Sequence, residues 1–199
     1  MKNLIESSLQ NSYSYLEYRK KVSDLLADGK SSGNEQSEDL LHYSQLNEVR
    51  MNRLDKTISV PESIQKQLGN LDKEYLWLVL AEGWCGDAAQ LLPIMQKMSV
   101  FSPKIDFKIV FRDENEGLMQ EFLTNGARAI PKLIILDVET HQVLGAWGPR
   151  PEAAARLIKE YKAKYGVVNE EAKTELQKWY LNDKGLSTME EIMKVMLLF

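Results

Sequence analysis

The segment AEGWCGDAAQLLP (81–93) carries the only cysteine of the chain, Cys85, between a predicted strand and a predicted helix. The preceding run YLWLVLA (75–81) is apolar throughout, as in a strand buried on both faces of a parallel sheet. Residues 87–100 have the pattern of a helix, so Cys85 lies where that helix begins. The free backbone N–H groups and the dipole of a helix start stabilise a thiolate. The position therefore predicts an activated thiol.

The elements that follow this segment predict an α/β domain. Further strands are expected at 105–111 and 132–137, a hairpin partner at 141–147, and helices at 114–124 and 151–165. The resulting order is β-α-β-α-β-β-α. The single βαβ unit implies a parallel pair of strands, and the short turn after residue 137 implies an antiparallel pair.

Helical patterns dominate both ends of the chain. We expect an N-terminal helical extension (1–70), a central domain (71–166) and a C-terminal helical hairpin (167–199). Tyr15, Tyr18 and Val22 share one helical face, and the Gly- and Ser-rich run 29–39 predicts a loop. The extension either packs on the domain or moves about this loop.

The last helix is expected to start with a capping box at 187–190 (STME) and to end in the apolar run 195–199 (VMLLF). Such an apolar end is expected to pack on the domain or on a second subunit, which would give a homodimer.

Composition excludes several classes of function. A net charge of -4 gives no electrostatic footprint for nucleic acid or for an anionic membrane. One cysteine and two distant histidines predict neither a disulfide nor a metal site, and no cofactor motif is visible. No signal peptide or membrane span is expected in the 199 residues. We therefore expect a cytoplasmic protein with a reduced thiol.

Several short motifs occur in a familiar order: W-C-G (84–86), a helix proline at 93, D-E-N (113–115) and N-G-A-R-A-I-P (125–131). Together they resemble the thioredoxin superfamily over residues 74–165. The resemblance implies a thioredoxin-like fold, with Pro131 as the cis-proline that faces the active cysteine and helps bind an extended substrate. WCGDAAQ (84–90) and GPRP (148–151) further resemble a bacterial subgroup of thioredoxin family proteins.

Departures from the family pattern remove its dithiol chemistry. Ala88 stands at the position of the resolving cysteine and Asp87 at that of the intervening proline. Val79 and Ile109 align with the family's buried acid and lysine. An intramolecular dithiol-disulfide cycle is therefore excluded, which leaves monothiol chemistry at Cys85, completed by an outside thiol.

The resemblance implies a catalytic Cys85 and a substrate groove lined by Trp84, Gly86, Asp87, Ile130 and Pro131. The Asp87 carboxylate opposes the helix start, because a nearby negative charge disfavours the thiolate. We expect a thiol pKa between about 6.5 and about 8.5.

Other polar residues near the motif have plainer interpretations. Glu82 is either a proton relay near the sulfur or a solvated charge at the end of a strand, and the second is favoured. Arg128 and Arg150 either bind a carboxylate or phosphate through two hydrogen bonds or face solvent, and the second is favoured. Asp113, with the glutamate after it, is expected to cap the second core helix.

Two functions remain open. The first is a thiol-disulfide redox or mixed-disulfide role through Cys85, which would make the protein an oxidoreductase without a resolving cysteine, acting on a protein or a small thiol or disulfide. The alternative is a redox-inactive binding module for a protein or peptide partner. The helical extensions favour this alternative, since they add surface unrelated to thiol exchange.

Overall fold

A computed structural model describes residues 1–198 of the protein. Its centre is a sheet of the strands β1 (Tyr75–Ala81), β2 (Ile105–Phe111), β3 (Lys132–Asp137) and β4 (Val143–Trp147), in the order β2-β1-β3-β4. β1 pairs with β2 in parallel, and β3 is antiparallel to both β1 and β4. The predicted bounds of β1 to β3 are confirmed. β4 begins two residues later than predicted, because His141 adopts a φ of 58° between the strands.

Strand β1 is buried along its whole length. It lies between β2 and β3, and helices cover both faces of the sheet, so no side chain of the strand reaches solvent. This explains its uninterrupted apolar sequence and gives the following turn a rigid base.

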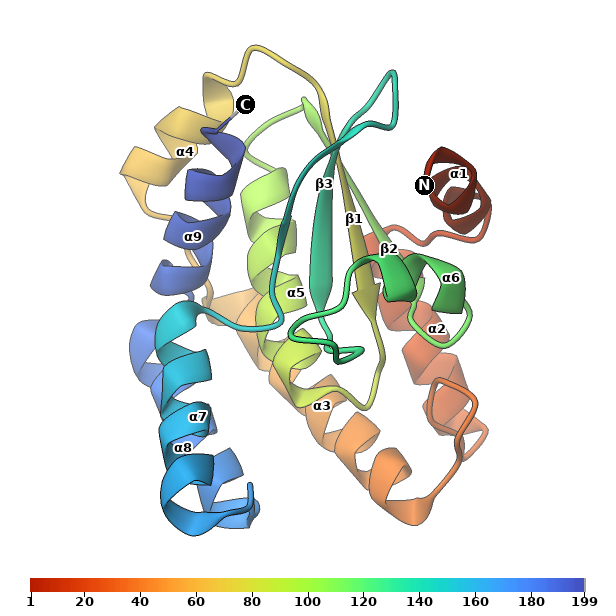
Figure 1. The fold of residues 1–199 in the computed structure, drawn as a ribbon, viewed down its shortest axis with the longest axis vertical. Helices are drawn as coiled ribbons and strands as arrows, with labels where there is room; N and C mark the ends of the chain where they lie inside the picture. Colours follow the sequence, from red (N-terminus) through yellow and green to blue (C-terminus); the bar gives the residue numbers. More distant parts are fainter. Residues whose placement is uncertain (199) are drawn as a thin grey trace.

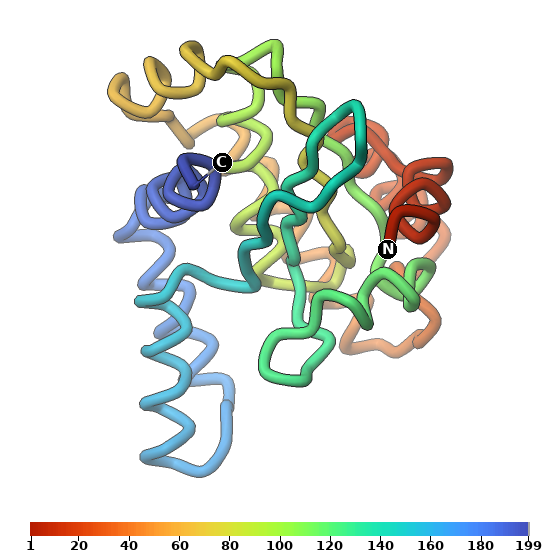
Figure 2. The backbone as a smooth tube through the Cα atoms, turned by 45° about the horizontal axis from the view of Figure 1, so that its top comes forward, coloured from red at the N-terminus to blue at the C-terminus, as the bar shows by residue number. Residues whose placement is uncertain are grey.

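Helices form a layer on each side of the sheet (Figure 1). One layer contains α4 (Glu62–Gly69), α5 (Gly86–Ser99) and α9 (Leu186–Met196), and the other contains α1 (Lys2–Gln10), α2 (Tyr15–Ala27) and α6 (Glu116–Glu121). The long helix α3 (Glu38–Thr57) packs on α2 and α5. Helices α7 (Glu152–Tyr165) and α8 (Glu170–Asp183) form a hairpin that projects from the body, as Figure 2 shows. No helix within residues 1–198 combines the length and apolar character needed to cross a bilayer.

The N-terminal extension packs on the central domain. Tyr15, Tyr18 and Val22 are buried on the predicted face of α2. Just before this helix, Tyr13 and Ile109 exchange two backbone hydrogen bonds of 2.8 Å, which adds a short antiparallel bridge at the edge of β2. The extension is therefore tied to the sheet and does not move freely about the loop.

The predicted capping box at the start of α9 is wrong. The helix begins at Leu186, and both the N–H and the hydroxyl of Ser187 bond to the Asp183 carboxylate. The reason is the tight turn before it, in which Lys184 and Gly185 adopt φ values of 54° and 84°.

The apolar face of α9 packs on the domain. Its buried side chains are Met189, Ile192, Met193 and Met196, and the helix contacts α4, α5 and β4. The run after it contains Leu198, which is exposed, while Phe199 lies outside the described residues.

Candidate functional site

Cys85 occupies the N-cap of α5, directly after the turn that follows β1. Its Sγ accepts the backbone N–H of Ala88 at 3.5 Å, and its S–H donates to the carbonyl oxygen of Ile130 at 3.4 Å. The residue is only 8% exposed. The nearby carbonyl acceptor and the burial of the sulfur both favour the protonated thiol over the thiolate.

Burial raises the pKa of the Cys85 thiol to about 12, and the charge of Asp87 adds to the effect. The N–H groups of the first helical turn and the Arg150 guanidinium act in the opposite direction but do not compensate. The expected pKa between about 6.5 and about 8.5 is therefore wrong. Desolvation makes the largest contribution, and it depends on packing that the local sequence around Cys85 does not reveal.

A cavity of about 830 Å³ opens beside the thiol. The predicted site residues on its wall are Trp84, Cys85, Gly86, Asp87 and Ile130. Pro131 is buried outside this lining, although its peptide bond with Ile130 is cis. The structure thus brings five of the six predicted residues to one cavity.

The rest of the wall includes side chains from both helical extensions. Helix α3 contributes Leu40, His42, Tyr43, Leu46 and Arg50, and the α8 helix contributes Glu170, Lys173, Thr174, Leu176 and Gln177. The sequence does not mark these residues as part of a site, because they belong to ordinary amphipathic helices without a chemical motif. They become part of the site only because α3 and α8, which are far apart in the sequence, line the same cavity in the fold.

Asp87 is 7% exposed and its carboxylate is fully engaged. It bonds to the Arg150 guanidinium at 2.6 Å and accepts the hydroxyl of Tyr180 at 2.8 Å. Arg150 was expected to face solvent, and that prediction is wrong. A buried carboxylate requires a partner, and Arg150 supplies the opposite charge.

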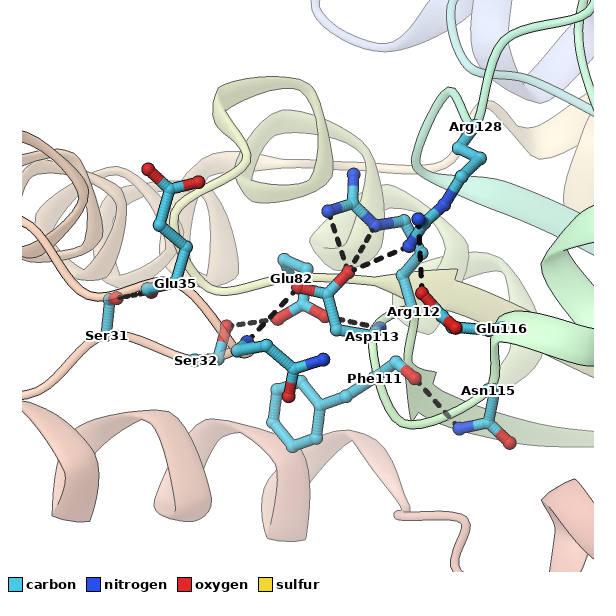
Figure 3. Close-up of polar contacts among 12 residues, drawn as sticks. Ser31, Ser32, Glu35, Glu82, Phe111, Arg112, Asp113, Asn115, Glu116 and Arg128 are labelled. Carbon is cyan, nitrogen blue, oxygen red and sulfur yellow. Dashed lines mark hydrogen bonds and ion pairs between the residues drawn. The ribbon is translucent and has the colours of Figure 1, made fainter.

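Glu82 is fully buried, so the prediction of a solvated charge is wrong. Figure 3 shows its carboxylate between Ser32 and the backbone of Asp113. The Ser32 hydroxyl donates to one oxygen, and the Asp113 N–H donates to the other at 3.0 Å. Burial raises the pKa of Glu82. This carboxylate holds the 29–37 loop against the turn that follows β1.

Asp113 was expected to cap the second core helix, and that prediction is wrong. Its carboxylate bonds to Arg112 at 2.8 Å and to Arg128 at 3.3 Å (Figure 3). Arg112 also lies over the ring of Trp84, at 4.9 Å from its centroid. Arg128 lies on the cavity wall and pairs with Asp113, which lies outside it, while its side chain remains 36% exposed to solvent.

No group of three or more His, Cys, Asp and Glu side chains in residues 1–198 is arranged to hold a metal ion. The cavity wall supplies one thiol, aromatic and apolar side chains and four guanidinium groups, together with His42, Lys173 and the carboxylates of Asp87 and Glu170.

The fold has known counterparts. An HIV epitope-scaffold matches with 19% sequence identity and a TM-score of 0.59, covering 89% of this chain and 98% of its own. A protein of unknown function from Pseudomonas aeruginosa matches with 17% identity and a TM-score of 0.56, covering 92% of this chain and 97% of its own. No curated protein sequence matches the chain.

The family model described as thioredoxin matches residues 33–162, which is more than half of the chain. The matched region contains the whole sheet, the Cys85 turn and helix α3. The expected thioredoxin-like fold with added helices is confirmed, and the chain belongs to the thioredoxin family.

Proposed function

We propose that the protein is a binding module of the thioredoxin family that holds a segment of a protein or peptide partner in the cavity beside Cys85. The observation that carries this proposal is that both helical extensions contribute to the cavity wall. Helices α3 and α8, one from each extension, line the cavity together with the Cys85 turn. Thiol exchange requires neither helix, whereas a recognition pocket requires walls. A volume of about 830 Å³ also lies in the range of ligand-binding pockets.

The state of the thiol supports a role without redox chemistry. Only the thiolate attacks a disulfide, and the pKa of Cys85 is raised to about 12. The chain has no second cysteine, and Ala88 occupies the position of the resolving thiol. The turn therefore presents a neutral S–H and backbone groups to the cavity.

Affinity capture of partners tests this proposal with three forms of the full chain. The wild type and Cys85→Ser are expected to retain the same partners, because the hydroxyl keeps the shape of the wall. Thr174→Trp is expected to lose them, because the larger side chain fills the cavity from α8, where Thr174 is exposed. Partners that depend on Cys85 but not on Thr174 would contradict the binding module.

A second function is a mixed-disulfide role through the monothiol W-C-G-D-A motif. It is favoured by the place of Sγ at the first turn of α5, on the cavity wall. In this reaction the Cys85 thiolate attacks one sulfur of a partner disulfide. The new S–S bond forms as the old one breaks, the second sulfur leaves as a thiolate, and an outside thiol later releases the partner.

Labelling of the folded protein with a small aromatic disulfide separates the two functions. Rapid labelling at pH 7, absent in Cys85→Ser, supports the mixed-disulfide role. Slow labelling at pH 7, as expected of a buried thiol with a pKa of about 12, supports the binding module.

A further inference from the structure

The cavity beside Cys85 has an excess of positive charge. Five cationic side chains line it, against two carboxylates, although the whole chain has a net charge of -4. Both carboxylates are already paired, Asp87 with Arg150 at 2.6 Å and Glu170 with Lys173 at 2.6 Å. The remaining three cations are arginines.

Two of these arginines have acidic partners outside the cavity wall. Asp113 binds both Arg112 and Arg128, and Glu116 binds Arg128 at 3.2 Å. Their charges are therefore largely compensated within the protein, which leaves Arg50 as the remaining cation of the wall.

Arg50 has no carboxylate within ion-pair distance among residues 1–198. Its guanidinium donates to Asn47 Oδ1 at 2.8 Å, and the Asn47 amide donates to the Gly83 carbonyl at 2.9 Å. These bonds anchor the side chain to the turn before Cys85. Burial and the nearby charge of Arg53 lower the pKa of Arg50, which is the signature of an uncompensated cation.

The guanidinium lies at the start of α5. Its nearest nitrogen is 3.6 Å from the position that a Cβ would take on Gly86, the residue after Cys85. We propose that Arg50 binds a carboxylate of the partner in this cavity, so that the segment recognised beside Cys85 is acidic. Guanidinium groups bind carboxylates through two parallel hydrogen bonds, which gives both affinity and orientation. This inference rests on the proposed binding function.

Two alkylating reagents that differ in charge test the site directly, with Cys85 as the reporter. Iodoacetate carries a carboxylate, and iodoacetamide of nearly the same size is neutral. The ratio of their rates at one pH cancels the thiolate fraction and the accessibility of the thiol. Arg50→Gln should lower this ratio about fivefold, the effect of removing one charge near a partly exposed site. Arg53→Gln is the matched control, because Arg53 is one turn further along α3, exposed and outside the cavity wall.

A second measurement does not require Cys85 to react. Succinate, compared with sodium chloride at equal ionic strength, is expected to raise the Tm of the wild type and of Arg53→Gln but not that of Arg50→Gln. An unchanged reagent ratio in Arg50→Gln, or a wild-type Tm that succinate does not raise, would overturn the carboxylate site. Either result leaves the proposed binding function standing, because that function is judged by the Thr174→Trp capture experiment.

Discussion

Replacing Asp87 by asparagine should make the Cys85 thiol more reactive. After burial, the Asp87 carboxylate is the second cause of the raised thiol pKa. The substitution removes this negative charge. The Arg150 guanidinium, which lies 2.6 Å from the carboxylate in the wild type, then remains as an unpaired positive charge near the sulfur. Both changes favour the thiolate, so the thiol pKa should fall.

The size of the effect follows from the charges involved. A unit charge about 5 Å away contributes about 3 kcal/mol at an effective dielectric constant of about 20, or about 2 pKa units. A fall from about 12 to about 10 raises the thiolate fraction at pH 8.5 about 100-fold. A thiolate of lower pKa is a weaker nucleophile, and this removes about tenfold of the gain. Asp87→Asn should therefore react about tenfold faster than the wild type.

The assay is the second-order rate of iodoacetamide labelling at pH 8.5, followed by mass spectrometry of the folded protein. Asp106→Asn is the control, since the Asp106 side chain on β2 is 52% exposed and lies outside the cavity wall. Arg150→Gln should act in the opposite direction, because it leaves the Asp87 carboxylate unpaired near the sulfur. Circular dichroism checks that each variant remains folded.

Equal labelling rates for Asp87→Asn and Asp106→Asn would refute the electrostatic reasoning and assign the raised pKa of Cys85 to burial alone. The pH profile of the wild type provides a second check. Its rate should rise about tenfold for each pH unit up to about pH 10, because the thiol stays mainly protonated over this range. A plateau near pH 7 would contradict the buried neutral thiol.

Three further outcomes concern stability and assembly. Ser32→Ala should lower the free energy of unfolding in urea by about 2–3 kcal/mol, because the buried Glu82 carboxylate loses a hydrogen-bond donor; a change below about 0.5 kcal/mol would contradict this role. Gly148→Ala should cost at least about 2 kcal/mol, since its φ is 110° and a Cβ would collide with a backbone carbonyl oxygen. Gly126→Ala, where φ is 77° and the surrounding space is open, should cost less. The packing of α9 on the domain leaves Leu198 exposed, so a homodimer through this end stays a prediction: Leu198→Glu should lower the mass in light scattering from dimer to monomer, and a monomeric wild type would contradict that assembly.

The central sheet could be predicted because its signals are local. The apolar run of β1 and the turn residues after it determine the strand, whatever packs around it. The same holds for Pro131 and the W-C-G motif, which depend on short stretches of sequence. The start of α9 was missed because Gly185 with a positive φ set the helix boundary before the capping sequence.

The environment of the thiol could not be predicted, because it depends on distant parts of the chain. Arg50 on α3 and Tyr180 on α8 meet the Cys85 turn only after the extensions pack on the domain. Glu82 illustrates the same limit. Its position at the end of a strand indicates exposure. In the fold its carboxylate is buried and accepts a hydrogen bond from Ser32, which is 50 residues earlier in the chain.

The cavity wall links the local stability of the two helical extensions to occupancy of the cavity. An occupant that touches α3, α5 and α8 at once adds shared contacts between segments that lie far apart in the sequence. Binding then raises the free energy needed to open either extension locally, by about 2.7 kcal/mol at a ligand concentration 100 times Kd. Slowed amide hydrogen exchange in α3 and α8 would therefore report occupancy of the cavity even when the Cys85 thiol does not react.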